Sequence, residues 1–137
     1  MPRLIFAFAA LVMALSACGT TSSSSTKFTG DKKVIADAVA ELQKAGERKD
    51  AGKICKEILA ADLVAAIERD GSSCTKEVKA AIDDADDFSL KVQDVTINGT
   101  TADVKVKGKA GKKDRLATFQ FRKENGKWRA TSLSPGG

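Results

Sequence analysis

The chain contains no histidine and no tyrosine among its 137 residues. Histidine is the commonest general acid or base and the commonest metal ligand, and tyrosine is a frequent oxyanion donor. Sites built on either side chain are therefore excluded, which leaves aspartate, glutamate, lysine and cysteine for chemistry. We expect a protein that is not an enzyme and that carries no cofactor and no metal.

Aromatic residues are also scarce, at 5% of the chain with a single tryptophan. The net charge is +5, from 23 basic and 18 acidic residues. No segment interleaves aromatic with basic side chains in the way that nucleic-acid-binding surfaces do, so nucleic acid is not an expected partner. Attraction to anionic lipid or to a cell-wall polymer remains open.

Long apolar runs are absent except near the N-terminus, where residues 4–15 are wholly apolar. Arg3 precedes this run, and Ser16 and Ala17 follow it, which is the layout of a secretory signal peptide. The run is too short for the ~20 residues that a membrane-spanning helix needs. A buried N-terminal helix or short membrane anchor is the alternative, but the segment has neither an amphipathic stripe nor a helix cap.

The segment Leu15-Ser16-Ala17-Cys18, followed by Gly19, resembles a bacterial lipobox. The resemblance implies removal of residues 1–17 and thioether attachment of a diacylglycerol to Cys18. Several acyl chains, such as palmitate, on one residue hold a protein on a membrane far better than a single chain does. The predicted location is the outer face of the cytoplasmic membrane, or an outer membrane where the envelope has one. An ordinary signal peptide or a free thiol at Cys18 are the competing interpretations, and an exposed thiol would be a liability.

Residues 18–30 combine the lipidated cysteine with a serine- and threonine-rich tether, with a reach of roughly 20 Å. Residues 31–134 are long enough for one domain with a single core. Residues 135–137 are expected to be a disordered tail.

Apolar residues recur at helical spacing through the first half of the domain. This spacing predicts three helices. The first runs from Asp31 as N-cap to Gly46 as stop, and the second runs from Asp50 as N-cap to Gly71 as stop, with a kink near 60–62. The third helix is expected to follow residues 72–75.

The apolar period changes to two after residue 87. Phe88, Leu90 and Val92 share one parity, and Val95 and Ile97 share the other, which predicts a β-bulge near residues 93–94. Two type I′ hairpin turns are expected, at Asn98-Gly99 and Asn125-Gly126, with a basic loop over 108–115 between them. Helices followed by an antiparallel meander indicate an α+β domain.

The order of elements and the segment FQFRKENGKWRA at 119–130 resemble the NTF2-like (SnoaL-like) proteins over residues 31–134. The resemblance implies three N-terminal helices packed on a curved antiparallel sheet of about four strands, in the shape of a cone. More narrowly, the chain is similar to small exported actinobacterial lipoproteins that combine a lipobox with one cysteine in the second helix and another before the third.

That resemblance also implies a pocket between the helices and the sheet. Phe119, Phe121, Trp128 and Val104 could line it, and Asp37 is the carboxylate to inspect. Core packing nevertheless explains the aromatic side chains better than a pocket does. The polar catalytic residues of NTF2-like enzymes have no counterpart in the chain.

Cys55 and Cys74 remain as a pair once Cys18 is assigned to lipid, and export would place them in an oxidising compartment. We expect a disulfide between them, with two free buried thiols as the alternative. A redox motif needs closer spacing, and zinc needs more ligands.

Two charged clusters complete the pattern. Asp83–Asp87 could bind a cation, although a solvated helix end explains the cluster better. The basic residues between 105 and 115 could contact lipid or a wall polymer, or they could guard an edge strand.

The sequence thus predicts a membrane-anchored envelope lipoprotein whose domain binds a small apolar ligand or an envelope protein. The alternative is an isomerase or cyclase that uses a pocket carboxylate.

Overall fold

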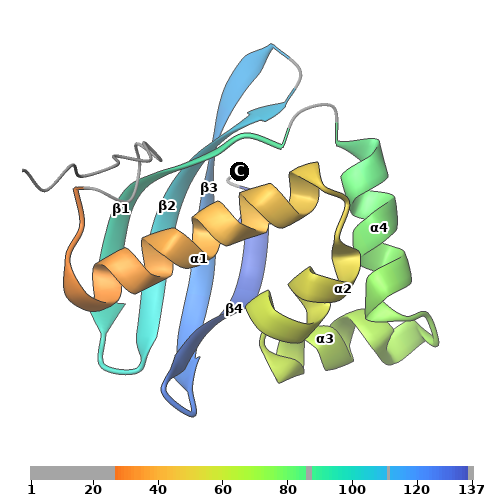
Figure 1. Cartoon of the computed structure of the whole chain (residues 1–137), viewed down its shortest axis with the longest axis horizontal. Coiled ribbons are helices and arrows are strands. Elements are labelled where there is room, and N and C mark those ends of the chain that lie inside the picture. Colours follow the sequence, from red (N-terminus) through yellow and green to blue (C-terminus); the bar gives the residue numbers. More distant parts are fainter. Residues whose placement is uncertain (1–26, 86–87, 111, 136–137) are drawn as a thin grey trace, which may run out of the picture.

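The computed structural model describes residues 27–85, 88–110 and 112–135. This part of the chain forms a set of helices and one antiparallel sheet with strand order β1-β2-β3-β4. Figure 1 shows α1 lying across one face of the sheet, with α2, α3 and α4 grouped beside it. The predicted α+β architecture, with helices first and a four-stranded antiparallel sheet second, is confirmed.

The helical half runs from α1 to α4 with two irregular turns. Its elements are α1 (Gly30–Glu47), α2 (Ala51–Lys53), the π-helical turn η1 (Ile54–Ile58), α3 (Ala61–Ile67), the 3-10 turn η2 (Glu68–Asp70) and α4 (Cys74–Asp84). The predicted kink is a break at residues 59–60, which are extended.

Local chemistry explains most helix ends. The Asp50 carboxylate accepts a hydrogen bond from the Lys53 backbone N–H at 3.1 Å, as an N-cap does. The Ser73 hydroxyl accepts one from the Lys76 N–H at 3.2 Å and starts α4. Gly71 ends η2 with φ +85°, which glycine adopts without strain.

The first helix begins and ends at other residues than the sequence predicts. The N-cap position belongs to Thr29, which makes no side-chain cap, and Asp31 lies in the first turn, where its charge favours the helix dipole. Gly46 does not stop α1 but lies buried within it, because the ring of Phe88 packs on its bare Cα. The chain leaves the helix through Lys49, at φ +57°.

The strands are β1 (Leu90–Asn98), β2 (Thr101–Ala110), β3 (Lys113–Glu124) and β4 (Lys127–Pro135). The predicted bulge lies between Val92 and Asp94, and a second irregularity follows Gln120. The β3–β4 turn has positive φ at Asn125 and Gly126, in agreement with type I′.

The β1–β2 turn differs from the prediction. Asn98 pairs with Thr101, so the turn residues are Gly99 and Thr100 rather than Asn98 and Gly99. Of these two, Gly99 alone has a positive φ, +61°, which fits type II′ and not type I′.

The predicted basic loop over 108–115 is also wrong, because β2 and β3 pair as far as Ala110 and Lys113. Lysine residues of β2 therefore lie on a strand between β1 and β3, not on an edge strand. Protection of a sheet edge cannot explain them.

The core fills the space between α1 and the sheet, and its largest fully buried side chains are Phe121, Ile35, Val39, Val95, Val104 and Val106. At the N-terminal side, the Lys27 ammonium donates to the Gln93 carbonyl at 3.0 Å, and Phe28 packs against the core. Residues 27–30 of the predicted tether thus belong to the domain or contact it. The predicted signal peptide, Cys18 and residues 18–26 lie outside the described residues, as do 136–137 of the predicted tail.

Candidate functional site

An apolar cavity of about 550 Å³ lies between the helices and the sheet. Its buried walls include Leu42 of α1, Ile54 of η1 and Phe119 of β3. Other lining side chains are only partly buried, so the cavity opens to solvent; these are Leu63, Ile67, Val78, Phe88, Leu90 and Leu133.

Helix α3 forms one wall of this cavity. None of its residues is fully buried, and its Leu63 and Ile67 side chains line the hollow. The start of α3 is fixed to the sheet because the Ala60 N–H donates to the Ala130 carbonyl at 2.8 Å. A short amphipathic helix that covers a cavity makes fewer apolar contacts than a helix packed in the core. Its position therefore depends on hydrogen bonds, ion pairs and covalent links to the rest of the domain.

The disulfide is one such attachment. Cys55 in η1 and Cys74 at the start of α4 are joined, with their Cα atoms 6.1 Å apart. The bond predicted from the sequence is therefore present in the structure. It closes a covalent loop that contains all of α3, and so it limits how far this wall can move away from the sheet.

The opposite wall depends on the approach of α1 to the start of β1. Phe88 lies against Gly46 and lines the cavity. The Leu90 N–H donates to the Gln43 side-chain oxygen at 2.9 Å, which ties the beginning of β1 to the same helix. These two contacts fix the position of the Phe88 ring.

Polar groups are few in the lining. Among the described residues that surround the cavity, only Thr131 and Ser132 of β4 are polar, and none carries a charge. The Thr131 hydroxyl donates to the Gln120 carbonyl at 3.2 Å. Such a lining can bury an apolar molecule and orient it by a hydroxyl, but it supplies no acid or base for proton transfer.

Of the five residues predicted to line a pocket, Phe119 alone lines this cavity. Phe121 and Val104 are 1% and 0% exposed and belong to the packed core. Trp128 is buried under the Lys123 ammonium, 5.9 Å from the ring centre. The cavity lies where the sheet faces α3 and α4, whereas these side chains pack elsewhere in the core.

Asp37 also differs from its expected position. It projects from the solvent side of α1 and pairs with Lys33, one turn earlier, at 2.7 Å. Its side chain is 44% exposed, so it offers the cavity no carboxylate. The helix buries its apolar stripe, and Asp37 lies off that stripe.

The lining residues of α3 and α4 were not predicted as a site. Their apolar stripes predict core packing, and a stripe that faces a hollow has the same spacing as one that faces a filled core. The signal that could have found them is the shortness of α3 between a break and a glycine stop, which leaves it little surface to bury.

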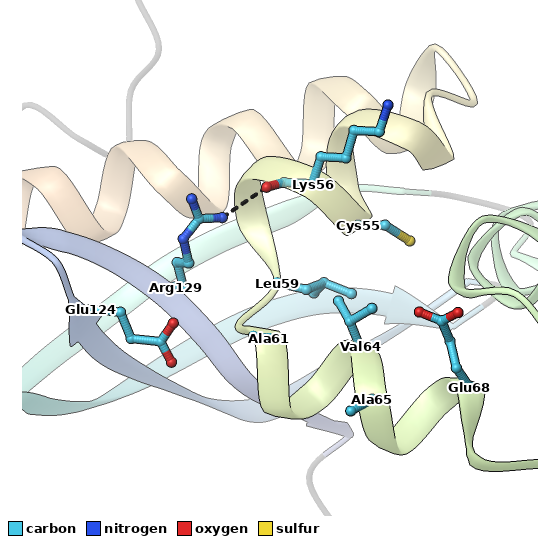
Figure 2. A pocket seen from close by; sticks show the side chains of 9 residues that line it. All are labelled: Cys55, Lys56, Leu59, Ala61, Val64, Ala65, Glu68, Glu124 and Arg129. Carbon is cyan, nitrogen blue, oxygen red and sulfur yellow. Dashed lines mark hydrogen bonds between the residues drawn. The ribbon is translucent and has the colours of Figure 1, made fainter.

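A second hollow, of about 560 Å³, lies beside the disulfide on the other side of α3 (Figure 2). Its lining is mixed, with Leu59 and Val64 between charged side chains. The Arg129 guanidinium donates to the Lys56 carbonyl at 2.9 Å, and Glu124 lies across the hollow from Glu68.

Glu124, one of the two acids that line this second hollow, is already paired. The Arg122 guanidinium binds Glu124 and also binds Asp62 of α3 at 2.8 Å. Hydrogen bonds to Glu124 and then to Asp62 raise the pKa of Arg122 above its ordinary value. This arrangement fastens α3 to β3, and it leaves the Glu124 carboxylate neutralised rather than free for catalysis.

The described residues contain no group of three or more side chains placed to hold a metal ion. In the predicted acidic cluster, Asp83 pairs with Lys49 at 3.1 Å, while Asp86 and Asp87 lie outside the described residues. None of the described helices has both the length and the apolar character needed to cross a membrane.

The sequence matches no protein-family profile and shows no significant similarity to a curated protein. Solved structures nevertheless share the fold. A designed NTF2-like protein, Rd1NTF2_05 with five substitutions, superposes with a TM-score of 0.56 at 13% identity, over 78% of this chain and 100% of that one. A SEC-C motif containing protein from Rhodopseudomonas palustris, RPA3114, gives a TM-score of 0.54 at 19% identity, over 73% of this chain and 77% of that one. At these identities the likeness concerns the fold alone, and the fold is the NTF2-like cone.

Proposed function

We propose that the chain is an exported lipoprotein, anchored to the membrane through Cys18, whose NTF2-like domain binds a small apolar ligand. The observation that carries the ligand is the cavity of about 550 Å³, lined by apolar side chains and two hydroxyl-bearing residues. Ligand sites in proteins are typically clefts of about 300–1,000 Å³ with mostly apolar walls and a few polar groups.

The anchor rests on the lipobox-like segment that ends at Cys18 and on the apolar run before it. The Cys55–Cys74 disulfide agrees with an exported location, because such bonds persist in oxidising compartments. The domain would act on the outer face of the cytoplasmic membrane, or on an outer membrane where there is one.

Binding is better supported than catalysis. An isomerase or cyclase would need an acid or base that reaches the ligand, and the described residues lining the cavity include none. A ligand released to, or received from, an envelope protein is compatible with the partly exposed rim.

Native mass spectrometry of the full-length gene product, isolated from a bacterium that acylates lipoproteins, tests both parts. We expect a chain that begins at Cys18, with the mass of a diacylglycerol, one disulfide and an apolar small molecule that collisional activation releases. An unmodified Cys18, or membrane retention and cleavage that persist in Cys18→Ala, would exclude the anchor. An acylated protein that neither retains a small molecule nor binds the apolar dye N-phenyl-1-naphthylamine would exclude the ligand.

A further inference from the structure

The positive charge of the chain is concentrated in one hairpin. Residues 105–115 of β2 and β3 contain six basic side chains and one acid, a net charge of +5, which equals the net charge of all 137 residues. The rest of the chain is therefore balanced. The hairpin extends beyond the helices, at the top of Figure 1.

The register of the sheet divides these charges between its two faces. Lys113 and Arg115 share the parity of Val106, whereas Lys105, Lys107 and Lys109 lie on the face opposite the helices. Asp94 pairs with Lys105 and Asp114 pairs with Lys109 on that outer face, so its charge is mixed with an excess of lysine. Val104 and Val106 are fully buried beneath the helices, so the alternating residues of β2 point outward. Lys107 pairs across the sheet with Lys91 on one side and with Leu116 on the other. We define the basic outer patch as Lys91, Lys105, Lys107, Lys109 and Leu116.

Leu116 is unusual in this position because its side chain is 64% exposed and has lysine as its cross-strand neighbour. A leucine side chain that stays in water contributes no burial free energy to the stability of the fold. Among the described residues, Val34 is the other exposed large hydrophobic residue, and it lies on α1, which covers the opposite face of the sheet.

A hollow of about 280 Å³ lies beside the patch, lined by Lys91, Lys107, Lys109 and Asp114 together with Ser89 and Gly108. Lys107 and Asp114 are paired at 3.0 Å. The hydrogen bond and the charge of Lys107, followed by the charges of Lys109 and Lys91, lower the pKa of Asp114. The direction of that shift agrees with a positive potential over the hollow.

We propose that the basic outer patch docks on the surface of a bilayer rich in anionic phospholipid, with lysine ammonium groups on the head-group phosphates and Leu116 inserted at the acyl boundary. Clustered lysines attract anionic lipid surfaces, and apolar side chains beside them add interfacial burial. A wall polymer would satisfy the lysines but would leave Leu116 in water. The inference rests on the proposed anchor only in that acylation would keep the domain at such a surface.

The test uses a fluorescent reporter at the patch. Trp128 is the single tryptophan and is 6% exposed, so its emission is a constant background. The full-length chain carrying Leu116→Trp is mixed with vesicles of brominated phosphatidylcholine, with or without phosphatidylglycerol. We expect a blue shift and loss of emission on the anionic vesicles, both reversed at 1 M salt, where the Debye length falls to about 3 Å.

Val34→Trp is the matched control, because it places the same reporter at the other exposed hydrophobic residue. Its emission should not change. In the Leu116→Trp background, Lys105→Gln with Lys109→Gln should restore the emission, whereas Lys76→Gln with Lys79→Gln on the exposed side of α4 should not.

Equal quenching at both reporters, or no quenching at Leu116→Trp on anionic vesicles, would overturn the docking surface. The mass of the acyl modification is measured on the same samples. Quenching of an unacylated chain would support the surface without the anchor, and an acylated chain without selective quenching would support the anchor without the surface.

Discussion

A methyl group on Gly46 would lie 2.3 Å from the ring of Phe88. The last turn of α1 and the wall of the apolar cavity therefore meet at a position where any side chain would overlap. Since Phe88 also lines the cavity, this contact links the packing of the first helix to the shape of the proposed ligand site.

Gly46→Ala should destabilise the domain. Overpacking a close contact costs about 1–3 kcal/mol, and the gain of about 1 kcal/mol from better helix propensity offsets only part of it. Urea unfolding followed by circular dichroism measures the difference. Gly52→Ala is the matched control, because the nearest atom to an added Cβ there is 3.8 Å away, so this change should be neutral or stabilising. Equal stability of the two variants would contradict the importance of the Phe88 contact.

Ala81→Trp should weaken the binding of an apolar dye. Ala81 lines the cavity from α4, so an indole at this position would occupy the volume that the ligand needs. We expect the affinity for N-phenyl-1-naphthylamine to fall by about tenfold or more, which corresponds to ~1.4 kcal/mol. Ala80→Trp adds the same bulk to a neighbouring exposed residue that does not line the cavity. Similar affinities for the two variants would show that the dye binds elsewhere.

Short-range chemistry is the part of the fold that the sequence predicted well. The Asp50 cap, the Gly71 stop, the bulge after Val92 and the Asn125-Gly126 turn each depend on a few neighbouring residues. The disulfide could also be predicted, because only two cysteines remained once Cys18 was set aside.

Features that depend on contacts distant in sequence were missed. Gly46 has the local signature of a helix stop, but Phe88, more than forty residues later, requires a glycine inside the helix. For the same reason the sequence pattern predicts the pocket at the aromatic residues of β3 and β4 and not at α3 and α4. Only the packing of α3 and α4 against the sheet decides that Phe119 faces a hollow while Phe121 is enclosed.

Replacing Cys55 and Cys74 by serine should destabilise the folded domain by about 3 kcal/mol, the loop-entropy value for a loop of this size. The loss should be greatest around α3, because its residues are not fully buried and the disulfide encloses it. Limited trypsin digestion reports this directly through cleavage at Arg69, which lies in the enclosed loop.

The wild-type chain treated with a reductant should match the double variant in both unfolding and cleavage. Cleavage at Lys76, which is exposed on α4 outside the loop, is the internal reference. A double variant with wild-type stability and unchanged cleavage at Arg69 would show that α3 is held by its ion pair and backbone contacts alone.

Acid should remove a small stabilisation contributed by Glu41. Its carboxylate accepts hydrogen bonds from Lys53 of α2 at 3.0 Å and from Lys44 at 3.3 Å, and these bonds lower its pKa below the ordinary 4.5. A carboxylate with a lowered pKa stabilises the fold fully above about pH 4.5, and this contribution is lost as the pH falls through the folded-state value. The side chains of Glu41 and Lys53 are 43% and 32% exposed, so solvent screening limits the stabilisation by this ion pair to less than about 1 kcal/mol.

Urea unfolding of Glu41→Gln and of the wild-type chain between pH 3 and 7 measures this contribution. The variant should be less stable at pH 7 and equally stable at the acid end, with a smaller difference in high salt, because partly exposed ion pairs are screened. Glu47→Gln is the control, because this exposed residue of α1 bonds to the neutral amide of Gln43 at 2.8 Å. The contrary outcome is a stability difference between wild type and Glu41→Gln that stays constant across the pH range. Protonation removes the charge of Glu41, so a constant difference would mean that the side chain stabilises the fold by packing and not by its charge.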